Sequence, residues 1–247
     1  MTQESRSAGG DARIRKHSGW LVPLILLALI GVFCALVLLY YLVPNPNSLA
    51  EEHTSPSAGM YRVQLRVGNL SLSTPANYLP YASERSGGPR RDVALYAELP
   101  GFHGFTDSTA EDFVSNSPKS RVIHILITRE TFDVAESARL KRIYLDEVVD
   151  RHGHAGSAGL VEYVFRNDSG YRGDDLFVGR VGSSDVVMRC TQPGPDVPSP
   201  NCIREVQYAQ GILLSYRFKR SQLMEWRKIA DGVERLVDAF VVHPKSG

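Results

Sequence analysis

Hydrophobic residues form one long run near the start of the chain and then recur in short alternating segments. The stretch from Trp20 to Val43 contains no charged side chain. Beyond about residue 60, several segments place apolar residues at every second position, which is typical of strands with one buried face. Two later segments have the three- and four-residue spacing of helices instead. This pattern predicts an α+β domain that follows an N-terminal transmembrane helix.

The apolar run over 20–43 predicts a membrane anchor. A helix needs about 20 apolar residues to cross the hydrocarbon layer of a bilayer, which is ~30 Å thick. Trp20 at one end and Tyr40 and Tyr41 at the other are typical of the two membrane interfaces. The alternative is a signal peptide cleaved near Ala50, but the apolar core of a signal peptide has only about 7–15 residues. We therefore expect the lipid bilayer to be a partner through residues 20–43.

The flanking segments predict the topology. Residues 1–19 place basic side chains next to the apolar run, which by the positive-inside rule makes them a cytoplasmic tail. Residues 44–59 are rich in Pro, Ser and Asn and are expected to be an extended linker. Residues 60–243 are then a periplasmic α+β domain of a single-pass inner-membrane protein.

The alternating segments predict a mostly antiparallel sheet, because the later ones follow one another with short connections. Arg121–Thr128 is apolar on both faces and is expected to be a central strand covered on both sides. The predicted strands are Tyr61–Val67, Leu70–Ser73, Asp92–Leu99, Arg121–Thr128, Gly159–Phe165, Leu176–Val181, Val186–Cys190, Ile203–Tyr208 and Gly211–Phe218.

Two segments predict helices. Glu136–Asp150 has a moderate helical period. Gln222–Val242 has a stronger one, with an apolar stripe from Leu223 to Phe240 and charges of both signs opposite, and Ser221 is placed to cap its first turn. We expect this amphipathic C-terminal helix to cover the sheet. Its mixed charges do not favour a membrane-surface helix, whose polar face is rich in Lys and Arg.

Charge and cysteine content narrow the function classes. The chain has 28 Lys and Arg against 27 Asp and Glu, so it lacks the basic excess that would predict a nucleic-acid partner.

The cysteines predict a disulfide. Cys34 lies in the anchor, whereas Cys190 and Cys202 flank a proline-rich loop between two predicted strands. An oxidising compartment would join this pair in a disulfide. A zinc or redox site is the alternative, but neither cysteine has a C-x-x-C spacing or a neighbouring histidine. No cofactor is expected.

The search for catalytic residues yields only a weak metal candidate. His152 and His154 are two residues apart, with Asp146, Glu147 and Asp150 nearby, and together they could bind a metal ion for a hydrolase. The other interpretation is a glycine-rich connection between a helix and a strand. His124 is interpreted as a hydrogen-bonded core histidine. G-x-S-x-G, H-E-x-x-H and Walker motifs do not occur, so no catalytic residue is predicted.

The segment Leu99–Thr106 is the candidate for partner binding. It follows a predicted strand and combines Phe102, His103 and Phe105 with two glycines and a proline. Such connections often carry recognition residues, so the loop could be exposed for binding, and its aromatic side chains could equally tuck under the sheet. Tyr78 and Tyr81 in the sequence NYLPY are further candidates.

Three sequence features together resemble a set of uncharacterised, single-anchored proteins of Gram-negative bacteria. They are V-x-L-x-V-G-N-L-x-L-x-x-P-x-N-Y-L from Val63 to Leu79, the C-x11-C pair, and GILLSYRFKRSQLMEW from Gly211 to Trp226. The resemblance implies a periplasmic location and carries over no activity and no functional residues.

The leading functional hypothesis is a non-catalytic module, tethered at the membrane, that binds a periplasmic or inner-membrane protein. An assembly factor and an immunity protein or inhibitor are examples of such a module. Two alternatives remain open. The protein could be a subunit of a larger inner-membrane complex, or a periplasmic metal-dependent hydrolase that uses the region 152–154.

Overall fold

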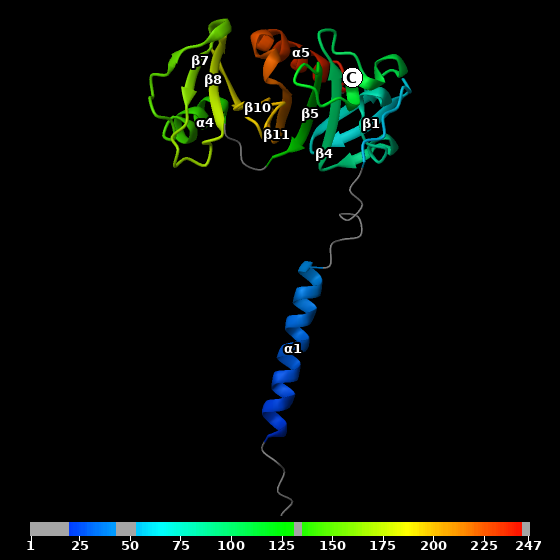
Figure 1. Ribbon diagram of the computed structural model, residues 1–247. Helices are drawn as coiled ribbons and strands as arrows, with labels where there is room; N and C mark the ends of the chain where they lie inside the picture. Colours follow the sequence, from blue (N-terminus) through cyan, green and yellow to red (C-terminus); the bar gives the residue numbers. More distant parts are fainter. Residues whose placement is uncertain (1–19, 43–52, 131–134, 244–247) are drawn as a thin grey trace, which may run out of the picture. The chain divides into compact units, whose positions relative to one another are not determined.

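A computed structural model describes residues 20–42, 53–130 and 135–243 (Figure 1). The chain divides into two compact units, Met1–Glu52 and His53–Gly247. The predicted cytoplasmic tail 1–19 and residues 44–52 of the predicted linker lie outside the described residues. In the described part of the linker, the Ser55 backbone N–H donates a hydrogen bond to the Pro80 carbonyl (2.8 Å), so contacts with the domain begin ahead of Met60.

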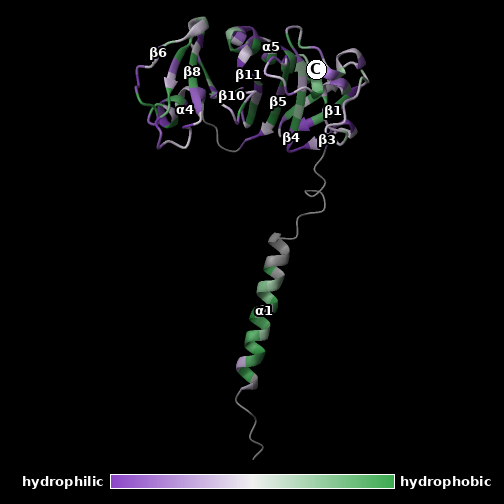
Figure 2. Cartoon of the chain, viewed as in Figure 1, coloured by the Kyte–Doolittle hydropathy of each residue, from purple (hydrophilic) through white to green (hydrophobic). Residues whose placement is uncertain are grey.

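The first unit contains helix α1 (Leu21–Leu42), whose 22 residues extend about 33 Å at the usual rise of an α-helix. Its residues are hydrophobic along most of its length (Figure 2). The described side chains are exposed, for example Leu27 at 70% and Phe33 at 68%. Within the described residues, no helix combines the length and hydropathy that a membrane crossing requires. The helical conformation is therefore present as expected, and the membrane span stays a prediction from the sequence.

The second unit is built on an eight-stranded sheet in the order β4-β5-β11-β10-β9-β8-β7-β6. Every neighbouring pair is antiparallel, which confirms the predicted antiparallel α+β class. Its strands are β4 (Asp92–Glu98), β5 (Val122–Arg129), β6 (His154–Ala155), β7 (Val161–Val164), β8 (Asp174–Val181), β9 (Ser184–Thr191), β10 (Asn201–Ala209) and β11 (Ile212–Lys219).

A smaller sheet has the order β2-β1-β3. Strands β1 (Arg62–Val67) and β2 (Leu70–Pro75) form a hairpin, and β3 (Gly88–Arg90) joins β1 in the one parallel pair of the described residues. The hairpin turns at Gly68, whose φ of 58° is readily adopted by glycine. Strand β2 also pairs with the segment that follows α5, because the Val242 backbone N–H donates to the Ser71 carbonyl (2.9 Å).

Helix α5 (Trp226–Asp238) packs on the sheet as predicted, with Trp226, Ile229, Val233 and Val237 buried in the main core. The preceding turns form a 3-10 segment, η6 (Arg220–Glu225), so the α-helix is shorter than expected. The predicted cap at Ser221 is wrong. Its hydroxyl donates instead to the Pro118 carbonyl (2.6 Å), because the preceding segment lies within its reach.

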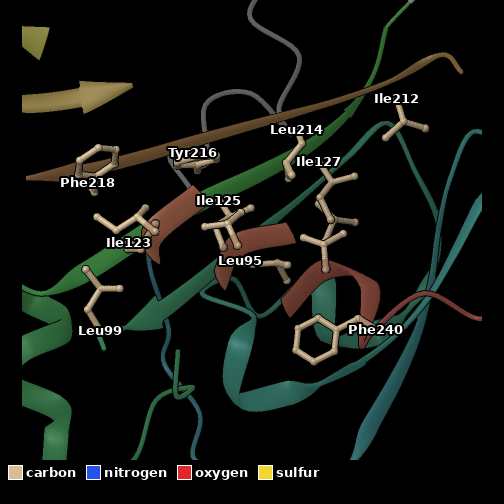
Figure 3. Close-up of a cluster of buried hydrophobic side chains, with 14 of the residues drawn as sticks. Leu95, Leu99, Ile123, Ile125, Ile127, Ile212, Leu214, Tyr216, Phe218 and Phe240 are labelled. Atoms are coloured by element: carbon tan, nitrogen blue, oxygen red, sulfur yellow. The ribbon is translucent and has the colours of Figure 1, made fainter. Parts of the chain in front are cut away.

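The main core lies between the sheet and α5. Figure 3 shows the buried apolar side chains gathered on one side of β5 and β11. They include Leu95 from β4, Ile123, Ile125 and Ile127 from β5, Ile212, Leu214, Tyr216 and Phe218 from β11, and Phe240 after α5. The opposite face of β5 is covered only near Val122, which packs with Tyr96, Phe105 and Phe113, while Leu126 is 41% exposed and His124 is exposed. The expectations that this strand is covered on both sides and that His124 is a core residue are therefore wrong.

The predicted helix over Glu136–Asp150 is also wrong beyond Tyr144. The structure has a short α4 (Glu136–Arg139) followed by one π-helical turn, η4 (Leu140–Tyr144). After this turn the chain pairs with a neighbouring strand segment, since the Val149 backbone N–H donates to the Val164 carbonyl (2.9 Å). The apolar residues of this segment therefore pack into a small second core, which contains Leu140, Tyr144, Val148, Phe165, Leu176 and Val187.

Short helical segments occur in the connections. They are η1 (Ala76–Tyr78), η2 (Glu84–Ser86), η3 (Asp107–Thr109), α3 (Ala110–Val114) and η5 (Ser157–Gly159).

The predicted disulfide is present. Cys190 and Cys202 lie directly opposite each other on β9 and β10, with their Cα atoms 3.9 Å apart and both side chains fully buried. The disulfide thus joins the two strands at the start of their pairing.

Candidate functional site

A groove of about 950 Å³ lies between the loop Leu99–Phe105 and helix α5. We call it the α5 groove. Its apolar lining comes from Tyr78, Leu99, Pro100, Phe102, Ile229, Leu236 and Ala239. Its charged lining comes from Arg121, Glu225, Lys228, Asp231 and Arg235. The groove thus combines an apolar floor with a rim of both charges.

Phe102 is held in an unusual conformation at the floor of this groove. Its φ of 55° lies in the left-handed region, which non-glycine residues seldom adopt and which often marks functional sites. The Tyr78 hydroxyl donates a hydrogen bond to the Phe102 carbonyl (3.0 Å) and stabilises this backbone. Burial raises the pKa of Tyr78, so the hydroxyl keeps the proton that it donates.

The rest of the loop is fixed by backbone hydrogen bonds. Glu98 and His103 exchange both of theirs, at 2.8 and 3.1 Å. The Phe105 N–H donates to the Asn77 carbonyl (2.7 Å), and the Asn77 amide donates to the Phe105 carbonyl (3.2 Å). Because both ends are bonded to the domain, the loop presents Phe102 from a preorganised backbone, which lowers the entropic cost of binding.

The N-terminal end of α5 is fixed as well. The Ala158 carbonyl accepts hydrogen bonds from the Trp226 indole (3.1 Å) and the Arg227 guanidinium (2.7 Å). Ala158 reaches this position with a φ of 53°. The Trp226 ring lies against Gly179 of β8, where an added Cβ would be 2.4 Å from the ring. Both walls of the α5 groove are therefore anchored to the domain.

The charges at the rim are available to a partner. Lys228 pairs with Glu225 at 2.6 Å, but both side chains are largely exposed, and such surface pairs contribute at most about 1 kcal/mol. Within the described residues, Arg121, Asp231 and Arg235 form no ion pair. A charged partner could therefore engage this rim without breaking a strong internal contact.

The structure brings together two of the predicted partner-binding residues, Tyr78 and Phe102. Phe105 is 7% exposed and packs with Tyr96 and Phe113, so this side chain tucks under the sheet. His103 is exposed and Tyr81 is half-buried, and neither lines the groove.

The sequence analysis missed the contribution of α5, whose residues it assigned to the core or to a solvated face. A signal was present in Gly232, a glycine within the apolar stripe of a helix. Glycine is unfavourable there unless another group approaches the backbone closely. Here that group is the Phe102 ring.

The candidate metal ligands His152 and His154 lie on the surface. The His152 side chain is 95% exposed, with its Nδ1 3.1 Å from an Asp150 carboxylate oxygen, and His154 is exposed in β6. In the part of the chain that the structure describes, no group of three or more His, Cys, Asp or Glu side chains is placed to hold a metal ion.

Fold and groove together define an α+β domain with a long antiparallel sheet, a C-terminal helix and an open groove beside that helix. No protein-family model and no curated protein sequence matches the chain. Two solved structures share the fold. An immunity protein of the Stenotrophomonas maltophilia type IV secretion system has a TM-score of 0.54 and 16% identity, over 74% of this chain and 94% of that one.

The second structure is the iron-regulated outer membrane lipoprotein FrpD of Neisseria meningitidis. Its TM-score is 0.50 with 12% identity, over 78% of this chain and 98% of that one. At these identities the likeness concerns the fold alone.

Proposed function

We propose that this protein is a membrane-anchored, non-catalytic binding module of the immunity or inhibitor type, and that the α5 groove binds its protein partner. The observation that carries the proposal is the apolar floor of the groove inside a rim of charges of both signs, three of which form no ion pair within the described residues. Protein interfaces have this arrangement, with an apolar centre that excludes water and a polar, solvent-accessible rim.

The floor provides the residues expected to contribute most to binding. Phe102 and Tyr78 are aromatic, half-buried and fixed by their hydrogen bond, and Leu236 is half-buried beside them. Aromatic anchors in preorganised positions dominate the binding energy of many interfaces. The rim adds specificity, since Arg121 and Arg235 favour acidic groups and Asp231 favours a basic one.

The fold likeness to an immunity protein of a type IV secretion system supports the same class of function. The likeness does not indicate which protein this chain binds.

The membrane anchor and the periplasmic location belong to the proposal. The uncharged run over 20–43, the basic residues before it and the exposed apolar side chains of α1 support an anchor in lipid. The buried Cys190–Cys202 disulfide supports an oxidising compartment such as the periplasm. If the protein is instead a subunit of a larger complex, replacing residues 20–43 with an unrelated apolar helix should prevent its incorporation.

Site-specific photo-crosslinking in cells tests the binding site. A photoreactive residue is placed at Lys228 or Arg235 in the rim and, as a control, at Lys141, which is exposed on η4 and does not line the groove. We expect one dominant crosslinked protein from both rim positions and none from the control position. Phe102→Ala in the same background should remove most of this product, because it deletes the aromatic anchor.

Two results would contradict the proposal. The first is the same set of crosslinked proteins from Lys141 as from the rim. The second is the absence of any protein crosslink at the rim when the full-length protein is present at its native level in the membrane.

A further inference from the structure

A second cavity lies on the face of the sheet opposite α5, apart from the α5 groove. Its volume is about 280 Å³. Its floor comes from β5, β10 and β11, and one wall comes from the segment 115–120 that follows α3. Three basic side chains line it, His124, Arg217 and Lys219, together with the hydroxyls of Ser115 and Ser120 and the amides of Asn116 and Asn201. The lining described contains no carboxylate.

Strand register brings the three basic side chains together. Arg217 of β11 lies directly opposite His124 of β5. Lys219 is two residues further along β11 and therefore on the same face, opposite Asn201 of β10. The cluster is thus a consequence of pairing between rigid strands and does not depend on a flexible loop.

Lys219 carries a charge that the described residues leave uncompensated. Its residue is 6% exposed, and its Nζ donates to the neutral Asn116 side chain (2.6 Å). Within the described residues, neither Lys219 nor Arg217 forms an ion pair. A buried charge is costly unless an opposite charge accompanies it.

Arg204, the other buried basic residue among those described, does have an opposite charge beside it. Arg204 is 4% exposed and makes two hydrogen bonds to the Glu136 carboxylate, both at 3.0 Å. The contrast between Arg204 and Lys219 indicates that the counter-charge of Lys219 comes from outside the described residues.

We propose that the cavity formed by His124, Arg217 and Lys219 binds a phosphate group. The two cations supply the opposite charge, and the surrounding hydroxyl and amide groups can donate to several oxygens of a tetrahedral anion. Hydrogen bonds between charged groups are about twice as strong as neutral ones, and the arginine fork matches phosphate geometry. A carboxylate, with two oxygens, would leave more of these donors unused.

The electrostatics of the cavity agree with this assignment. Removal from solvent, together with the charges of Arg217 and Lys219, lowers the pKa of His124 to about 4. Desolvation and the charge of Arg217 likewise lower the pKa of Lys219. A bound phosphate would reverse these shifts, so the pKa of His124 reports on occupancy.

The test uses the full-length protein in detergent at pH 7, with inorganic phosphate as the probe and chloride at matched ionic strength as the reference. Binding is measured by calorimetry and by the His124 ring signals in NMR. We expect saturable phosphate binding that raises the pKa of His124. Arg217→Gln should weaken it about tenfold, the usual effect of losing one charged hydrogen bond. Arg129→Gln removes the same charge from β5 outside the cavity and should leave binding unchanged.

The source of the phosphate group is resolved by a parallel titration. Glycerophosphoglycerol, a water-soluble lipid headgroup, is compared with inorganic phosphate. Tighter binding of the headgroup assigns the cavity to a lipid phosphate, and tighter binding of phosphate assigns it to a free or small phosphorylated ligand. The proposal is overturned if neither probe binds saturably, or if Arg129→Gln weakens binding as much as Arg217→Gln. This result is independent of the α5 groove and its partner.

Discussion

The ring of Phe102 lies directly over Gly232 of helix α5. A Cβ atom added at Gly232 would come within 2.1 Å of the ring, so the contact exists only because position 232 carries no side chain. The two residues are far apart in the sequence, and they join the loop Leu99–Phe105 to α5. This contact therefore determines the shape of the groove that we propose as the binding site.

Gly232→Ala should reshape the groove while the domain stays folded. Alanine favours a helix over glycine by up to about 1 kcal/mol, which offsets part of the cost of moving the Phe102 ring. We expect the free energy of unfolding to change by less than about 1 kcal/mol, and the crosslinked partner at Lys228 to be lost. Gly170→Ala is the control, because no atom lies within 4 Å of a Cβ added there. Unchanged crosslinking in Gly232→Ala would argue against the groove.

Loss of the disulfide should destabilise the domain. Cys190 and Cys202 are separated by 12 residues, and bridges that close loops of similar size contribute about 2–4 kcal/mol. Denaturant unfolding of the Cys190→Ala, Cys202→Ala double variant measures this loss. Cys34→Ala, outside the domain, should have no effect on the unfolding of the domain. Free thiols at 190 and 202 in natively exported protein would contradict the disulfide.

Glu136 and Arg204 form a buried ion pair. The Glu136 carboxylate also accepts a hydrogen bond from the Val187 backbone N–H (2.5 Å), so it joins α4 to β9 and β10. Removing one partner of a buried pair costs about 3–5 kcal/mol, because the other charge stays buried. We expect this loss from Glu136→Ala in denaturant unfolding.

Asp185→Asn is the matched control for that measurement. It breaks the pair with Arg180, whose side chain is 72% exposed, and surface pairs of this kind contribute at most about 1 kcal/mol. Equal losses in the two variants would show that burial does not decide the strength of these pairs.

His124 should make stability depend on pH. Its pKa is about 4 in the folded protein, against 6.5 for an unperturbed histidine, so between these values the unfolded state binds more protons. Its contribution is therefore present above pH 6.5 and is lost as the pH falls from 6.5 toward 4. The groups that face it are Arg217, Lys219 and the opposing Tyr96.

The His124 contribution is measured as the difference between the wild-type protein and His124→Gln. The wild-type midpoint of urea unfolding should fall more steeply between pH 6.5 and 4 than that of the variant. Parallel pH profiles would mean that the imidazole titrates normally.

The alternating pattern of the sequence was sufficient to predict most of the strands, because the period of two depends only on which side of a strand is buried. Val63, Leu65 and Val67 lie inward on β1 as that period requires. Other short segments were equally sufficient for prediction. The apolar spacing of three and four residues predicted α5, the two cysteines around a proline-rich loop predicted the disulfide, and the uncharged apolar run predicted the helix over 21–42.

Tertiary structure decided the rest, since these features depend on segments that are distant in sequence. The helix expected over Glu136–Asp150 ends at Tyr144 because the backbone near Val149 pairs with Val164. His124 is exposed because the region of Phe105 and Phe113 covers that side of β5 only near Val122. The α5 groove and the cluster of His124, Arg217 and Lys219 arise from packing and strand order, which the local pattern of a single segment does not encode.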